Sequence, residues 1–403
     1  MKILIVSHAA GTPEIGPNMR TYYLGRHLVK MGNTVSVVGS GNFHKYRVSP
    51  LAGGKYTTGK SDGIEYHWLP TFPYKKRNYQ QVVNQLDFAY QLWRFRKRWL
   101  AMQPDIVLVS SPPPFGIFVG KYLAQKCGSR LIFEVRDLWP ELIQELGDFS
   151  KNHPYMRLIQ KTVNVAYRAA DGIVSVKPGD LSHIQEKYNI KGRTAFIPNG
   201  YDHTAILDET FMHPVFQKES FKIIYTGALS SYYAIEYLLL AAEKLQATHP
   251  DVEIIIAGDG NDRPTYETLK KEKSLNNVTF LGFLPKKYML SIIRQSNVAF
   301  LGLRNTKANQ NGISTNKLYE YMYAKIPVIA SYNTDYDLVK EIGCGLSIPP
   351  ESTDAIYSAV VQLYETSVTD RKIMGQKGYD CLMTRHTFTE IAKKYVELME
   401  TLK

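Results

Sequence analysis

The chain has 403 residues, enough for two domains with a core each, and its formal net charge is +12 at pH 7. This excess of lysine and arginine favours anionic partners such as nucleic acid, phosphorylated small molecules or an acidic membrane surface. We find no nucleic-acid-binding motif, no apolar run that could span a bilayer and no signal peptide. The three cysteines, Cys127, Cys344 and Cys381, lack disulfide or metal-ligand spacing, so we expect a cytoplasmic protein.

The first half alternates continuous apolar runs with helical patterns, which is typical of parallel strands buried on both faces. Strands are expected at 2–7, 34–38, 105–110, 130–135, 171–176 and 194–197. The loop after the first strand lacks the glycine spacing of a dinucleotide-binding motif. Gly16 at the next helix start either admits a phosphate or sugar or simply forms a turn.

The segment 74–99 combines aromatic residues at helical spacing with many cations and one acid, Asp87. We favour a core helix whose basic side chains extend into solvent. The alternative is peripheral contact with the anionic inner face of the cytoplasmic membrane. Its seven basic residues are Lys75, Lys76, Arg77, Arg94, Arg96, Lys97 and Arg98.

Charged residues follow the strand at 130–135, in Phe133-Glu-Val-Arg-Asp-Leu-Trp-Pro-Glu141. Ligands of open α/β sheets gather at the carboxyl ends of strands. Asp137 is therefore a candidate site residue, with Arg136 and Glu141 beside it. A strand-end salt bridge explains the same residues equally well.

The second half repeats the pattern after a polar stretch at 201–220, which we expect to be a linker. Strands are expected there at 221–225, 252–257, 278–283 and 298–303. We predict an α/β protein with Rossmann-like domains at 1–200 and 221–385 that face each other across a cleft. A terminal helix is expected within 386–403.

The stretch 311–330 contains a polar loop, a helix, a turn at Pro327 and a buried strand. Lys317 and Glu320 are three residues apart and so share one helix face near its start. This pair suits a nucleotide, because a cation binds phosphate and a carboxylate binds ribose hydroxyls. Taken alone, the pattern also describes a capped, charged surface turn.

Several landmarks follow the order seen in the GT4 glycosyltransferases: Pro198-Asn-Gly-Tyr-Asp202, Ala257-Gly-Asp-Gly260, Val278-Thr-Phe-Leu-Gly-Phe283, and Lys317-Leu-Tyr-Glu320 before Pro327-Val-Ile. The chain resembles this family, of GT-B fold, over nearly its whole length. The resemblance implies that the C-terminal helix crosses back onto the first domain. The stretch 133–141 is similar to the branch with the WbuB-type and colanic-acid enzymes of bacterial surface polysaccharide synthesis.

The resemblance implies a retaining transferase that moves sugar from a nucleotide-diphosphate donor, expected to be UDP-linked, to a lipid-linked or oligosaccharide acceptor. No metal or other cofactor is expected. Catalytic roles would fall on Asp137, Lys317 and Glu320. Donor contacts would come from Gly16, Gly227, Phe283, Arg304, Asn311, Gly312, Ile313, Ser314, Lys317 and Glu320. The acceptor side would hold His8, Asn18, Arg136, Asp137 and Glu141.

The chain departs from the family pattern in two places. The first of the family's paired glutamates falls at Gly312, and no basic pair follows Gly227. We therefore expect Lys317 and Arg304 to meet the charge of the donor diphosphate. Two alternatives stay open: a non-hydrolysing sugar-nucleotide 2-epimerase of the same fold, and a non-catalytic nucleotide-sugar binder.

Overall fold

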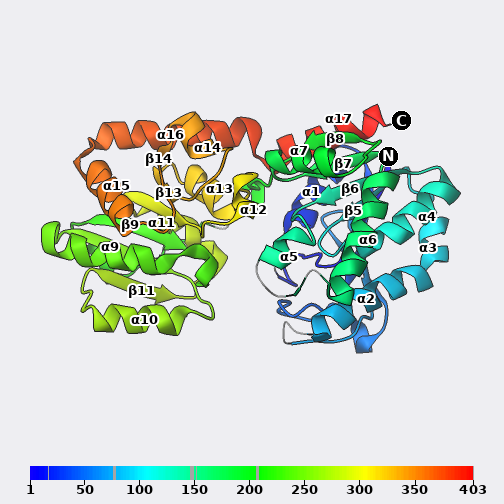
Figure 1. The fold of residues 1–403 in the computed structure, drawn as a ribbon, viewed down its shortest axis with the longest axis horizontal. Helices are drawn as coiled ribbons and strands as arrows, with labels where there is room; N and C mark the ends of the chain where they lie inside the picture. The colour runs from blue at the N-terminus through cyan, green and yellow to red at the C-terminus, as the bar shows by residue number, and fades with distance from the viewer. Residues whose placement is uncertain (17, 76–78, 146–148, 151, 206–207, 403) are drawn as a thin grey trace. The chain divides into compact units, whose positions relative to one another are not determined.

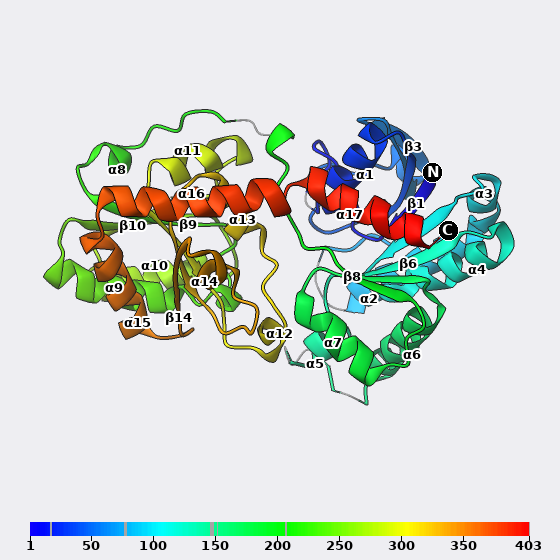
Figure 2. The ribbon, with the colours of Figure 1, turned by 90° about the horizontal axis from the view of Figure 1, so that it is seen from above.

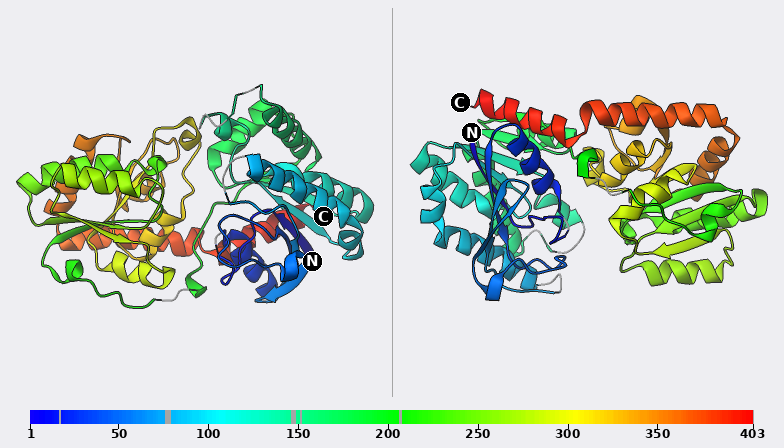
Figure 3. Two further views of the ribbon diagram at one scale, coloured as in Figure 1. Left: turned by 90° about the horizontal axis from the view of Figure 1, so that it is seen from below. Right: turned by 180° about the vertical axis from the view of Figure 1, so that it is seen from behind.

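The computed structural model describes residues 1–16, 18–75, 79–145, 149–150, 152–205 and 208–402 (Figure 1). It divides into two compact units, of which the first is Met1–Asn199 with Phe388–Lys403 and the second is Gly200–Thr387. Each unit contains one mainly parallel sheet with helices on both faces (Figure 3). Among the described residues, none of the helices has the length and apolarity that a membrane crossing needs.

The sheet of the first unit has the order β3-β4-β2-β1-β5-β6-β7-β8. Only β3 and β4 pair antiparallel; the other neighbours are parallel. The strands are β1 (Lys2–Ser7), β2 (Thr34–Ser40), β3 (Thr57–Ser61), β4 (Ile64–Leu69), β5 (Ile106–Ser110), β6 (Arg130–Val135), β7 (Gly172–Ser175) and β8 (Arg193–Phe196).

Side chains of β1 alternate between two cores, because successive residues of a strand point to opposite faces. Leu4 and Val6 face α2–α7, whereas Ile3 and Ile5 face α1 and α17. The C-terminal helix α17 packs on α1 (Figure 2). The helices are α1 (Arg20–Lys30), α2 (Tyr79–Arg94), α3 (Arg96–Ala101), α4 (Ile117–Cys127), α5 (Glu141–Glu145), α6 (Pro154–Ala169), α7 (Pro178–Lys187) and α17 (Phe388–Thr401).

The second unit has an all-parallel sheet of order β11-β10-β9-β12-β13-β14. Ile223 and Tyr225 of β9 face α9, α10 and α15, whereas Ile224 faces α8, α11, α13, α14 and α16. The strands are β9 (Phe221–Thr226), β10 (Val252–Ala257), β11 (Val278–Gly282), β12 (Val298–Gly302), β13 (Val328–Ser331) and β14 (Gly345–Ile348). The helices are α8 (Pro214–Gln217), α9 (Ile235–Thr248), α10 (Arg263–Glu272), α11 (Met289–Arg294), α12 (Lys307–Gln310), α13 (Asn316–Tyr323), α14 (Leu338–Ile342), α15 (Thr353–Glu365) and α16 (Val368–Arg385).

The stretch 201–220, which we expected to be a linker, lies within the second unit. Val215 of α8 is buried in the same core as Ile224. Tyr201 forms a β-bridge with Thr387, so the first and last residues of this unit lie side by side. The described part of this stretch is therefore polar because many of its side chains are exposed, although Val215 packs into the core of the second unit.

Candidate functional site

The second unit has a topological switch point between β9 and β12. From β9 the chain continues to β10 and β11 on one side of the sheet and to β12, β13 and β14 on the other. Ligands of open α/β sheets bind outside the carboxyl ends of the strands at such a point. Gly227 follows β9 and Leu303 follows β12, so the residues around these two positions are the first candidates.

Gly227 lies directly against the side chain of Lys317. Its φ is +117°, a conformation that side-chain-bearing residues rarely adopt. A Cβ atom at this position would lie 2.4 Å from Cε and 3.0 Å from Nζ of Lys317. The glycine predicted at this turn thus leaves room for a lysine that enters from the first turn of α13.

The Lys317 ammonium is enclosed by aromatic rings. Its Nζ lies 3.2 Å from the ring centroid of Tyr233 and 5.1 Å from that of Tyr225, which are cation–π contacts. Lys317 is 8% exposed, and burial lowers its pKa to about 7, although the nearby Glu320 carboxylate acts in the opposite direction. An anion brought to this ammonium would stabilise its charged form, as a phosphate group does.

Glu320 lies one turn further along α13 and is half-buried. Burial raises the pKa of this carboxyl group, and Lys286 and Lys317 oppose the rise. Within the part of the chain that the structure describes, its carboxylate makes no ion pair within 4.0 Å and accepts no hydrogen bond. A carboxylate in this state can accept hydrogen bonds from ligand hydroxyls.

The loop from Asn311 to Ser314 leads into the start of α13. Gly312 is buried with φ +125°, and its N–H donates to the carbonyl of Asn309 at 3.1 Å. Thr315, the N-cap residue, provides no side-chain cap, and the first turn of α13 has no acid. Uncapped N–H groups and the helix dipole favour an anion at this end, next to Lys317. Ile313 and Ser314 come just before this helix start in the chain.

The turn after β10 was noted in the sequence only as a landmark, yet it shapes this site. A Cβ at Gly258 would lie 1.7 Å from the carbonyl oxygen of Gly227, and one at Gly260 would lie 2.1 Å from that of Leu229. The turns after β9 and β10 therefore touch through their backbones, which only glycine permits. Tyr233 was also missed, because an aromatic residue after a glycine turn has no distinctive spacing.

Arg304 is held in an ion-pair network. Its guanidinium pairs with Glu236 and, at 2.7 Å, with Glu351, and it donates to the carbonyl of Ser231 at 2.8 Å. Two carboxylates thus already meet its charge, and its role as a cation for the diphosphate stays a prediction. Phe283, another predicted donor contact, follows β11 and is 67% exposed.

Glu141, predicted on the acceptor side, belongs instead to a salt bridge. It pairs with Lys187 of α7 and lies 3.7 Å from His183 Nε2. The pKa of the Glu141 carboxyl group is lowered. Burial alone would raise this pKa, but the hydrogen bond from Lys187 and the other favourable contacts outweigh the effect of burial. The alternative that we left open for this strand end is the correct one for Glu141.

Asp137 and Arg136 follow β6 and are both half-buried. Burial raises the pKa of Asp137, and the positive charges of Lys177 and Arg136 oppose this shift. Asp137 is thus a carboxylate at the end of a central strand that lies near two cations. This position agrees with the predicted location.

His8 follows β1 at the switch point between β1 and β5, but it is buried inside the first unit. Its Nε2 lies 2.6 Å from Oδ1 of Asn84, and burial lowers its pKa to about 4. His8 is therefore a neutral core histidine, and its role on the acceptor side stays a prediction. Gly16 and Asn18 both have left-handed φ, +117° and +69°, in the loop before α1.

The segment 74–99 forms α2 and α3, and Lys76 and Arg77 lie outside the described residues. Phe88, Leu92 and Trp99 are buried, as the favoured core prediction requires, but it is wrong for Leu86 and Trp93 of the second apolar stripe, which are exposed. The opposite face of α2 nevertheless exposes large apolar side chains at helical spacing. We call this set the α2 stripe: Tyr79, Val83, Leu86, Tyr90 and Trp93, which are 71%, 40%, 39%, 62% and 44% exposed.

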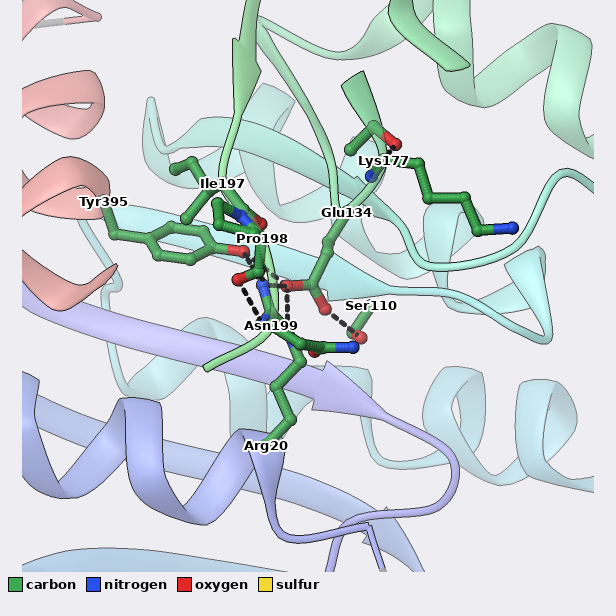
Figure 4. A network of polar contacts seen from close by, with 9 residues as sticks. Arg20, Ser110, Glu134, Lys177, Ile197, Pro198, Asn199 and Tyr395 are labelled. Atoms are coloured by element: carbon green, nitrogen blue, oxygen red, sulfur yellow. Dashed lines mark hydrogen bonds and ion pairs between the residues drawn. The ribbon is translucent and has the colours of Figure 1, made fainter. Parts of the chain in front are cut away.

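A buried ion pair between Arg20 and Glu134 was not predicted (Figure 4). Nε of Arg20 donates to Glu134 at 2.9 Å, and Nη1 donates to the carbonyl of Pro198 and to Asn199, both at 2.9 Å. Tyr395 of α17 also donates to Glu134. The network joins α1, β6, the end of the first unit's main segment and the C-terminal helix, so we assign it a structural role.

Comparisons with known proteins identify both units. Residues 16–205 match Glycosyltransferase Family 4, and residues 208–380 match Glycosyl transferases group 1. The alpha-D-kanosaminyltransferase of Streptomyces kanamyceticus is 28% identical over 145 residues, so the match spans only 36% of that relative and 36% of this chain.

Two solved structures cover nearly the whole fold. Sucrose-phosphate synthase from Thermosynechococcus elongatus has a TM-score of 0.77 at 16% identity and covers 100% of this chain and 98% of its own. Anabaena HepE in complex with UDP and glucose has a TM-score of 0.65 at 14% identity and covers 100% of both chains. The predicted GT-B fold, with two Rossmann-like parallel sheets, is confirmed.

Proposed function

We propose that this chain of two glycosyltransferase-type domains is a retaining glycosyltransferase, with a UDP-linked sugar as donor and a lipid-linked saccharide as acceptor. The WbuB-like stretch at 133–141 supports a role in bacterial surface polysaccharide synthesis, of O-antigen or capsule type. One observation carries the proposal. A buried lysine lies over a glycine turn at the switch point of the second unit, one helical turn from an available carboxylate.

The diphosphate, the ribose and the sugar of a nucleotide-diphosphate sugar each have a proposed counterpart in the second unit. The diphosphate would lie at Lys317 and the start of α13, where the lysine charge and the helix dipole are both favourable. The ribose hydroxyls would donate to Glu320. The sugar would contact the backbone of the loop from Asn311 to Ser314, which replaces the missing glutamate at Gly312. The UDP complex of HepE supports this class of ligand by analogy of fold.

The proposed chemistry relies on stabilising the leaving group. Negative charge grows on the diphosphate as the glycosidic bond breaks, and Lys317 would stabilise it without a divalent metal. In a retaining transfer the departing phosphate can accept the proton of the acceptor hydroxyl. A strong side-chain base is then unnecessary, and Asp137 would orient the acceptor on the first unit.

The α2 stripe supports peripheral contact with an anionic membrane. Aromatic and aliphatic side chains suit the interfacial region of a bilayer, and the neighbouring Arg94, Arg96 and Lys97 suit its acidic headgroups. Cζ of Arg96 lies 4.9 Å from the ring centroid of Trp93, so a positive charge and an aromatic ring lie side by side at this end of α2. A lipid-linked acceptor would be reached from this surface.

The decisive experiment compares wild type with Lys317→Met in a thermal-shift screen of nucleotides and nucleotide sugars. A specific donor should raise the melting temperature of wild type through ligand linkage, and the variant should lose most of that shift. Product analysis with the best donor then separates the candidates. Transfer to a lipid-linked saccharide supports the proposal, whereas epimerisation without acceptor, or binding with neither transfer nor hydrolysis, would reject it.

A further inference from the structure

The first unit contains a pocket of about 660 Å³ that none of the predicted site residues lines. It is formed by the segments that follow β2 and β4 and by the first turn of α2. Both strands are parallel members of the sheet, so the pocket lies at the carboxyl edge where α/β sheets bind ligands.

One wall of the pocket consists of aromatic rings that are fixed by their own contacts. The Phe43 and Tyr46 rings pack edge to face with centroids 5.4 Å apart, and the Tyr46 hydroxyl donates to the carbonyl of Ala10 at 2.7 Å. Tyr74 is 7% exposed, and its hydroxyl lies 2.9 Å from Nδ1 of His44. Rings that are already immobilised bind a ligand without a further loss of side-chain entropy.

Apart from the tyrosines, the polar side chains among the described lining residues are two amides, the Ser49 hydroxyl and one cation. The Asn42 side-chain nitrogen donates to the carbonyl of Thr71 at 2.6 Å, so its orientation is fixed. Lys75 is exposed at the rim, and no carboxylate is among the described lining residues. Aromatic faces with amide groups suit a sugar ring, and a lysine without a nearby acid suits a phosphate.

The pocket is continuous with the α2 stripe. Gln80 lines the pocket from the first turn of α2, and the adjacent Tyr79 is the first and most exposed residue of the stripe. A ligand with a polar, charged head and an apolar tail would therefore find both parts of its binding surface at the same helix end.

We propose that this pocket binds the diphosphate-linked sugar of a lipid-carried acceptor. The sugar ring lies against Phe43 and Tyr74, a phosphate contacts Lys75, and the lipid chain extends toward the α2 stripe. The inference deepens the proposed function, on which the lipid-linked nature of the acceptor rests, and it assigns the acceptor to residues that the sequence did not indicate.

The test uses the full chain with Phe43→Ala, Lys75→Ala and a matched control, Lys60→Ala, which removes an exposed lysine on β3 outside the pocket. The probes are farnesyl diphosphates carrying N-acetylglucosamine, galactose or glucose, together with farnesyl diphosphate alone and the methyl glycosides. Calorimetry measures their binding, and UDP binding is measured in parallel for every variant.

We expect at least one sugar-bearing probe to bind wild type more tightly than farnesyl diphosphate or its methyl glycoside. Phe43→Ala and Lys75→Ala should weaken that binding about tenfold or more, as expected for loss of about 1.4 kcal/mol, and Lys60→Ala should not. UDP affinity should stay unchanged in all three variants. Wild-type probe binding by both pocket variants would overturn the proposal, and so would a protein that binds UDP but none of the sugar-bearing probes. If wild type itself did not bind UDP, that result would instead reject the proposed function.

Discussion

The Lys317 side chain occupies the space that a Cβ atom on residue 227 would need. Replacement of Gly227 by alanine should therefore push the ammonium away from Tyr233 and also strain a backbone with φ +117°. We expect UDP affinity to fall about tenfold or more, and the free energy of unfolding to fall by about 1–3 kcal/mol. Calorimetry and chemical denaturation measure the two effects.

Gly343→Ala is the matched control for this change. Gly343 has φ +64°, but the nearest atom to a Cβ there is Nζ of Lys377 at 3.6 Å. The control should lose stability through backbone strain alone and keep full UDP affinity. Equal UDP affinity in Gly227→Ala and wild type would show that this turn does not position a donor-binding lysine.

The lowered pKa of Lys317 predicts a pH dependence of donor binding. Because the pKa is about 7 in the ligand-free protein, the ammonium loses its proton as the pH rises through 7. A bound diphosphate would raise that pKa, so UDP affinity should fall between pH 7 and 9, by at most about tenfold per pH unit. The terminal phosphate of UDP, with a second pKa of about 6, is already mostly ionised at pH 7, so its own titration contributes little to this fall.

Lys317→Met should bind UDP weakly and without this pH dependence.

The same lowered pKa means that the unfolded chain holds more protons than the folded one between pH 7 and 10.5. The free energy of unfolding of the ligand-free protein should thus rise with pH over this window, and less so in the variant. A pH-independent UDP affinity in wild type would exclude Lys317 from the phosphate site.

Glu320→Gln tests recognition of the ribose. The carboxylate should accept two hydroxyl hydrogen bonds that the amide cannot match, so UDP affinity should fall about tenfold with little loss of stability. The sharper readout compares UDP with 2′,3′-dideoxy-UDP. Wild type should prefer UDP, and the variant should bind both alike; an unchanged preference would place the ribose elsewhere.

Removal of the cations beside the α2 stripe should reduce membrane binding. Arg94→Ser, Arg96→Ser and Lys97→Ser together should weaken sedimentation with vesicles containing phosphatidylglycerol, because each cation near such a surface contributes about 1 kcal/mol. Lys270→Ser, Lys271→Ser and Lys273→Ser together, at the C-terminal end of α10, are the control for the loss of three positive charges. Equal effects of the two sets would mean that the membrane recognises charge in general rather than this helix.

Arg20→Met should destabilise the protein by about 3–5 kcal/mol, because it leaves the buried Glu134 carboxylate without its cation. Adding Glu134→Leu should recover part of this loss, since no buried charge then remains unpaired. Chemical denaturation of both single variants and the double variant measures the coupling. Additive losses would show that the two side chains act independently.

The apolar runs identified most strands of both sheets, because parallel strands that are buried on both faces have nearly continuous apolar sequences. The β3–β4 hairpin was missed even though its turn, Asp62-Gly63, has positive φ at both residues and a typical hairpin sequence. Strand β14 was missed because its four residues are half-buried and include a glycine.

The site was predictable where its residues share one helix and not where they meet across the fold. Lys317 and Glu320 are three residues apart, so their common face follows from helix geometry. The ion pairs of Arg304 were not foreseen because its partners Glu236 and Glu351 lie 68 and 47 residues away in the chain. The contact between the Tyr233 ring and Lys317 joins two separate elements of the second unit, which no local spacing reveals.

The C-terminal helix supplies Ile391, Tyr395 and Met399 to the core of the unit that begins at residue 1. During synthesis, that core cannot be completed until residues 388–402 have left the ribosome. The second unit is continuous in the chain and has no such delay, so the later half is able to finish folding before the earlier one, against the usual order of emergence.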